Sequence, residues 1–134
     1  MKRLFSSEPL WDNKGLGLIR IIVGLLVAYH GHEVFRPDLM RSYTEWEMFK
    51  GSFGLMKVYV GKSAEFIAGV LLTLGWFTRV GSIILIGSLG YITFFVGNGR
   101  FWYEDQHPFM FVLFGILFFT MGPGSFSFDA RKKT

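Results

Sequence analysis

The residues with the clearest chemical potential stand in one apolar run, KSAEFIAGVLLTLGWFTR, which contains the acid Glu65. From 58 to 77 this run has about 20 residues, so as a helix it would be ~30 Å long and could cross a bilayer core. An ionisable acid inside such a span costs roughly 2.5–3.5 kcal/mol. We therefore expect Glu65 to have a partner or a function. Lys62, three residues earlier, is placed to pair with it.

Histidines and a second acid lie near the same predicted depth. His30 and Glu33 share a helix face at the end of the first apolar run, and His107 precedes the last run. Imidazole and carboxylate ligands suit zinc or iron, but His30 and His32 would diverge by about 160° on a helix. We therefore predict histidines at a wet interface and no metal site. For Glu65 and its neighbours two alternatives stay open: a structural network, or a site that binds a head group or handles protons.

A second ionisable residue, Arg20, stands inside the first apolar run. Gly17, Gly24 and Gly31 recur every seven residues, and Arg20 lies one turn from the first two. Small residues on one helix face let neighbouring backbones approach closely. Arg20 is therefore expected to face protein and to hydrogen-bond Glu65 or backbone carbonyls, with packing, snorkelling and anion binding as further roles.

The composition identifies the class of protein. The chain has 134 residues, of which 51% are hydrophobic and 19% aromatic, and a mean hydropathy of +0.37. We predict a single all-α domain over residues 1–134, a polytopic membrane protein whose four-helix bundle spans about 15–35, 58–77, 80–96 and 108–121. An amphipathic interfacial helix should connect the first two spans, with aromatic anchors at Tyr43, Trp46 and Phe49. Pro37 suits its start and Gly51 its end.

Charge and cysteine content exclude several functions. The net charge of +4 comes from residues at the ends of apolar runs, which favours lipid anchoring over nucleic-acid binding. Cysteine is absent, which rules out disulfides, dithiol chemistry and thiolate metal sites. We find no haem or iron–sulfur ligand set.

Four spans would place both termini on one side of the membrane. That side would carry the larger share of the positive residues, including Arg79 as an anchor after the second span, so both termini are predicted in the cytoplasm. The positive residues on that side are Lys2, Arg3, Lys14, Arg79, Arg131, Lys132 and Lys133, against Arg36, Arg41, Lys50, Lys57 and Arg100 opposite.

Several of these motifs resemble the DoxX family of small four-helix bacterial inner-membrane proteins. They are Arg20-x-x-x-Gly24 with His30-Gly31, then the segment from Glu65 to Thr78-Arg79, and the closing Gly122-Pro123-Gly124 through Asp129. Where a lysine commonly follows the His-Gly pair, this chain has His32. The resemblance implies a bacterial inner-membrane protein. Family members include the small subunit of a thiosulfate:quinone oxidoreductase, and others are linked to oxidative-stress assemblies.

Three hypotheses for the function follow. The first is a redox-associated membrane subunit that binds a quinone or lipid-like molecule in a polar pocket near Glu65 and His30, with a protein partner or a second copy supplying further chemistry. The second is a non-enzymatic scaffold or accessory subunit. The third is a small-solute or proton pathway. The candidate ligand and proton network comprises Arg20, His30, Glu33, Lys62, Glu65 and His107.

Overall fold

The computed structural model describes residues 2–46 and 49–131, and every regular element within these ranges is helical. Glu47 of the predicted interfacial helix, and Lys132 and Lys133 of the predicted basic terminus, lie outside them. The elements in chain order are η1 (Lys2–Phe5), α1 (Asp12–Gly31), η2 (His32–Phe35), α2 (Pro37–Ser42), η3 (Tyr43–Glu45), α3 (Gly54–Leu74), α4 (Thr78–Tyr91), the π-helical turn η5 (Ile92–Val96), α5 (Gln106–Met121) and α6 (Phe128–Arg131).

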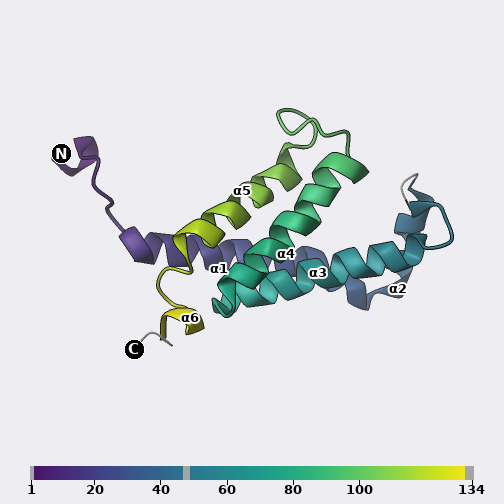
Figure 1. Cartoon of the computed structure of the whole chain (residues 1–134), viewed down its shortest axis with the longest axis horizontal. Helices are drawn as coiled ribbons and strands as arrows, with labels where there is room; N and C mark the ends of the chain where they lie inside the picture. The colour runs from purple at the N-terminus through teal and green to yellow at the C-terminus, as the bar shows by residue number, and fades with distance from the viewer. Residues whose placement is uncertain (1, 47–48, 132–134) are drawn as a thin grey trace.

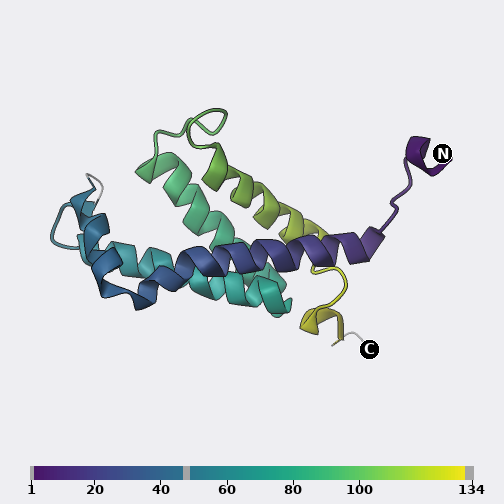
Figure 2. The ribbon, with the colours of Figure 1, turned by 180° about the vertical axis from the view of Figure 1, so that it is seen from behind.

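The long helices form two antiparallel pairs. Helices α1 and α3 lie side by side along most of their length, while α4 and α5 form a hairpin that leans away from them (Figures 1 and 2). Both ends of the chain lie at the end of the molecule where α3 turns into α4 (Figure 1). The α2 segment and the α4–α5 connection lie away from that end.

Glycines allow the close contact between α1 and α3. A Cβ atom added at Gly24 would lie 2.5 Å from the backbone nitrogen of Thr73, and one at Gly31 would lie 2.2 Å from that of Phe66. On α3, a Cβ atom at Gly69 would lie 2.3 Å from the nitrogen of Ala28. Real Cβ atoms do not approach so closely, so these positions must lack one. The predicted seam of small residues is confirmed: Gly24 and Gly31 face α3, whereas Gly17 faces Ser125 of the C-terminal segment.

The apolar core joins the two pairs of helices. Its residues come from all four long helices, and their burial fixes the base from which the α4–α5 hairpin leans. They are Val23, Val27, Ala68, Leu72, Leu85, Phe111 and Phe118.

Two stretches of the described chain are long and apolar enough to cross a membrane: Asp12–Phe35 and Thr78–Val96. Helix α5 is apolar but has only 16 residues. Helix α3 has 21 residues, yet Lys57, Lys62 and Glu65 fall within any 18-residue window of it. The prediction of spans at 15–35 and 80–96 thus agrees with length and composition, whereas the spans at 58–77 and 108–121 stay predictions.

The prediction of one continuous interfacial helix is wrong. Helix α2 starts at Pro37, as expected, but ends at Ser42, and the 3₁₀ turn Tyr43–Glu45 follows it. The hydroxyls of Ser42 and Thr44 donate hydrogen bonds to carbonyls three residues earlier, and such side-chain bonds compete with regular helix formation. Trp46 then has an extended backbone.

The second predicted span has different ends in the structure. Helix α3 begins at Gly54, before the predicted start at Val58, and stops at Leu74 rather than Phe77. Gly75 ends it in the left-handed conformation, with φ 65°, which only glycine adopts without strain.

We expect Gly24→Ala to lower the free energy of unfolding by about 1–3 kcal/mol, because the added methyl group would overpack the α1–α3 contact. Gly15→Ala on the same helix is the matched control, since its Cβ atom would meet Trp11 at an ordinary 3.6 Å. Thermal unfolding of both variants in detergent would measure the difference. Equal stability of the two variants would contradict the assigned role of the glycine seam.

Candidate functional site

The ionisable residues of the helices gather at two opposite ends of the molecule. Arg20 and Arg79 lie at the end that carries the termini, whereas His30, Glu33, Lys62, Glu65 and His107 lie towards the other end. The sequence analysis placed Arg20 in the same network as Glu65, but the structure separates them.

Arg20 binds backbone carbonyls through all three of its nitrogens. The side chain is fully buried. Its Nε donates to the carbonyl of Leu72 at 2.8 Å, and Nη2 donates to that of Phe126 at 2.7 Å. Its Nη1 donates to the carbonyl of Pro123 and, at 3.1 Å, to that of Ser125. Of the partners predicted for Arg20, the structure therefore shows the backbone carbonyls. These hydrogen bonds link α1 to α3 and to the C-terminal segment.

The C-terminal segment is shaped to present these carbonyls. Gly122, Gly124 and Phe126 all have positive φ, so the Gly-Pro-Gly sequence provides turns that most residues adopt only with strain. A Cβ atom at Gly124 would lie 2.6 Å from the nitrogen of Gly17, and the nitrogen of Ser125 donates to the carbonyl of Asn13 at 3.0 Å. The segment is thus packed directly on α1.

Asp129 fastens the same segment to the turn between α3 and α4. Its carboxylate accepts hydrogen bonds from the backbone nitrogens of Phe77 and Thr78, at 3.0 and 2.8 Å. A carboxylate at a helix N-terminus satisfies free donors and complements the helix dipole. Asp129 also donates its own nitrogen to the carbonyl of Gly75 at 2.9 Å. Sequence reasoning did not predict that Arg20 and Asp129 act on the same segment.

Arg79 lies at the same end but outside this network of carbonyls. Its side chain is exposed, and its guanidinium carbon lies 5.8 Å from the centre of the Phe119 ring. An exposed cation at this position is consistent with the predicted anchor.

At the other end, Lys62 stands between two carboxylates. Its Nζ lies 3.2 Å from Oε2 of Glu33 and 3.3 Å from Oε2 of Glu65. The side chain of Glu65 is only 4% exposed, that of Lys62 14% and that of Glu33 25%. The predicted Lys62–Glu65 pair is therefore present, and Glu33 extends it towards the surface.

Tyr43 completes this cluster, a role that the sequence analysis did not predict. Its hydroxyl donates to Oε2 of Glu33 at 2.6 Å, and Nζ of Lys62 lies 5.2 Å from the centre of its ring. Burial raises the pKa of Tyr43 above its usual value, and the hydrogen bond to Glu33 adds to the shift. The ten-residue separation from Glu33 has no helical period, so spacing alone could not reveal the contact.

The two histidines lie together beside this cluster. The rings of His30 and His107 meet edge to face with centres 5.8 Å apart, and both contact the ring of Phe111. Lys62 donates to the backbone carbonyl of His30 at 3.4 Å. Within the described ranges, no hydrogen bond is made by the imidazole nitrogens of His30 or His107. His32 lies apart from this pair, with its Nδ1 bonded to the carbonyl of Tyr29.

No three histidine, aspartate or glutamate side chains of the described residues are grouped as metal ligands. The acids near His30 are instead engaged with Lys62. The chemistry available here is therefore hydrogen bonding and proton transfer by carboxylate, ammonium, phenol and imidazole groups.

A cavity of about 720 Å³ lies beside these groups. Its polar lining residues include His30, Lys57, Lys62, Glu65 and His107, and residues of α3, α4, η5 and α5 form apolar walls. Tyr43, Trp46 and Phe49 cover one side. Its volume is in the range of ordinary ligand sites. The apolar lining residues are Val27, Met56, Val58, Val60, Ile84, Leu89, Ile92, Val96, Pro108 and Phe111.

We expect Arg20→Met to lower the free energy of unfolding by about 3 kcal/mol or more. Several carbonyls would lose their donor, and each buried group left without a partner costs ~1–3 kcal/mol. Arg79→Met removes the same charge from an exposed position and is the control. Thermal unfolding of the purified variants measures both. Equally small losses would contradict the structural role of Arg20.

We also expect Tyr43 to ionise at a higher pH than the usual tyrosine pKa near 10 would give. The Tyr43–Glu33 bond should stabilise the fold fully below that pH and fade as the pH rises through the higher folded-state pKa of Tyr43. Ultraviolet absorbance during an alkaline titration follows tyrosinate formation. Tyr43→Phe should remove the late component, whereas Tyr103→Phe, at an exposed position, should leave it. Persistence of that component in Tyr43→Phe would disprove the assignment.

Comparison with known proteins gives one family match. The DoxX family model matches residues 15–98, which include α1, α3 and α4 and hence the motif from Arg20 to Arg79. Helix α5 and the closing Gly122–Asp129 element lie beyond the matched range. No match was found among curated proteins or among solved structures. Since the match covers more than half of the chain, this protein belongs to the DoxX family of membrane proteins.

Proposed function

We propose that this DoxX protein is a redox-associated membrane subunit that binds a quinone or a similar lipid-like molecule in the cavity beside Glu65. The observation that carries the proposal is a cavity with largely apolar walls and a few polar groups, among which Glu65 is nearly buried. Such a shape suits a ligand with a small polar head and an apolar body. Intramembrane acids are also functional candidates by default.

The polar groups that line the cavity can form hydrogen bonds with a head group that carries carbonyl oxygens. Oε2 of Glu65 is bonded to Lys62, but Oε1 has no hydrogen-bond partner among the described residues. His30 and His107 line the same space. Imidazole and a buried carboxyl group can donate hydrogen bonds to carbonyl oxygens and exchange protons with them.

The membrane placement belongs to the same proposal. In it, α1, α3, α4 with η5, and α5 all cross the inner membrane of a bacterium, and both termini lie in the cytoplasm. The paired charges Lys62 and Glu65 lower the cost of inserting α3. These two charged residues would then lie near the opposite surface. Because the sequence has no cysteine, thiol-based redox chemistry would fall to a protein partner.

The test is native mass spectrometry of the protein extracted in mild detergent, followed by solvent extraction and identification of bound small molecules. We expect a stoichiometric quinone in the wild type and its loss in Glu65→Gln and His30→Ala. Glu8→Gln and His32→Ala are matched controls outside the cavity and should retain it.

A wild-type protein that carries no quinone, and binds none when it is added, would refute the proposal. If Glu65→Gln then impaired only folding or assembly with a second polypeptide, a scaffold or accessory role would replace it.

A further inference from the structure

Two glycines in the helices around the cavity have no packing role in the structure. Gly61 on α3 and Gly87 on α4 both line the cavity, and a Cβ atom added at either one would meet nothing within 4 Å. Glycine destabilises a helix interior relative to alanine. At Gly24 and Gly69 the close approach of another helix explains the glycine, but no protein neighbour explains it at Gly61 or Gly87.

The space at these glycines arises because α3 and α4 diverge. Near the turn that joins them, a Cβ atom at Gly81 would lie 3.1 Å from Cβ of Leu71. Six residues further along α4, on a side of the helix about 120° away, Gly87 faces open space. Figure 1 shows the same divergence, with α4 leaving α3 as it rises from the turn. The cavity lies in this region, between the separating helices.

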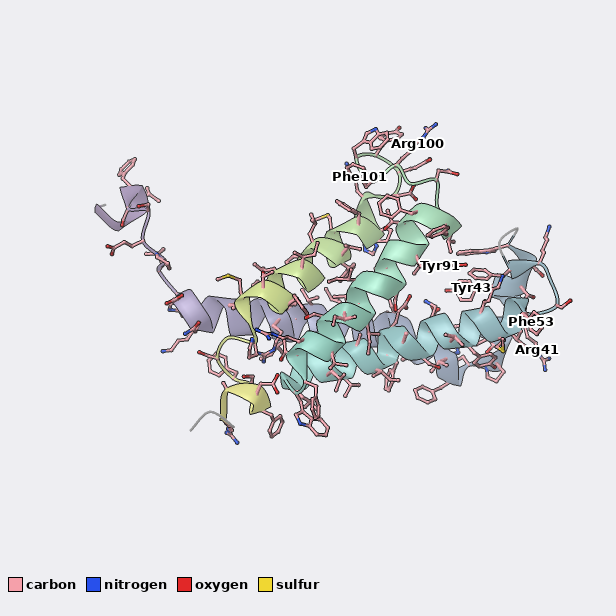
Figure 3. All side chains as sticks on the ribbon, in the orientation of Figure 1. Arg41, Tyr43, Phe53, Tyr91, Arg100 and Phe101 are labelled. Carbon is pink, nitrogen blue, oxygen red and sulfur yellow. The ribbon has the colours of Figure 1, made fainter. Side chains whose placement is uncertain are left out.

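A buried polar group faces the same space. Gly61 and Glu65 are four residues apart and so share one face of α3. The side chain of Glu65 is 4% exposed, it lines the cavity, and its Oε1 has no partner among the described residues. Tyr43 and Tyr91 of α4, both labelled in Figure 3, also line the cavity. A route past the glycines therefore leads to a group with unused hydrogen-bonding capacity.

We propose that Gly61 and Gly87 form the lateral entrance through which the flat ring of a quinone passes from the bilayer to Glu65. The inference rests on the proposed function and adds the residues that admit the ligand. The cavity walls are largely apolar, and the charged residues that line the cavity are Lys57, Lys62 and Glu65. A phospholipid retained in place of a quinone is therefore the competing outcome that the experiment distinguishes.

The experiment compares side chains of increasing size at the entrance. Full-length wild type and the variants Gly61→Ala, Gly61→Leu, Gly87→Ala and Gly87→Leu are purified in detergent, and the rate at which a short-chain benzoquinone associates with each is measured by stopped flow. Gly90→Ala is the matched control, since that position lies outside the cavity and its Cβ atom would meet Val112 at 3.9 Å. Thermal unfolding of every variant is measured in parallel.

We expect the quinone to associate with the leucine variants about tenfold more slowly than with the wild type, because an entrance governs the rate of binding. The alanine variants should be slowed less, and the control should associate at the wild-type rate. All variants should melt no lower than the wild type, because the added side chains enter open space and alanine and leucine favour a helix.

Folded leucine variants that bind the quinone as fast as the wild type would overturn the entrance while leaving the proposed function intact. Leucine variants that melt well below the wild type would also overturn it, since the space would then be filled by protein. A wild type that retains phospholipid and binds no quinone would refute the quinone assignment in both proposals.

Discussion

A fully buried guanidinium must find hydrogen-bond acceptors, and the arrangement of this chain depends on how Arg20 does so. Its acceptors are carbonyls of Leu72, Pro123, Ser125 and Phe126, which belong to α3 and to a segment more than a hundred residues away. Because the charge of arginine persists at any ordinary pH, these carbonyls have to stay in place for α1 to remain folded against its neighbours. The hydrogen bonds of Arg20 thereby hold α1, α3 and the C-terminal segment together at the end that carries the termini.

The two helix pairs are held together at this end and separate towards the other. The α4–α5 hairpin is anchored where Asp129 caps α4, and it leans away from the α1–α3 pair (Figure 2). The cavity is lined by residues of both pairs. Helix α3 connects the two ends, because it contributes a carbonyl to Arg20 and carries Lys62 and Glu65.

The features that could be predicted from the sequence are those with a helical period. The seven-residue repeat of Gly17, Gly24 and Gly31 predicted a packed face, and the spacing of Lys62 and Glu65 predicted their ion pair. Contacts between distant segments could not be predicted in this way. Neither the carbonyls around Arg20 nor the bond from Tyr43 to Glu33 follows a period.

The glycines show most clearly what spacing in the sequence cannot predict. Gly24 and Gly61 both occupy apolar helices, yet one faces a backbone and the other faces open space. Only the position of the neighbouring helix separates the two cases. The prediction of the interfacial helix is wrong for a related reason. Hydrogen bonds from the hydroxyls of Ser42 and Thr44 interrupt a segment whose apolar residues have helical spacing.

The central claim is that the ligand occupies the cavity away from the termini. Photoaffinity labelling with an azido-benzoquinone, followed by peptide mass spectrometry, tests it most directly. The account predicts labels in α3 between Met56 and Glu65 and in α4 and η5 between Ile84 and Val96, with loss of labelling when unlabelled quinone competes. Labels concentrated around Arg20 and residues 122–131, or spread evenly over the apolar helices, would contradict it.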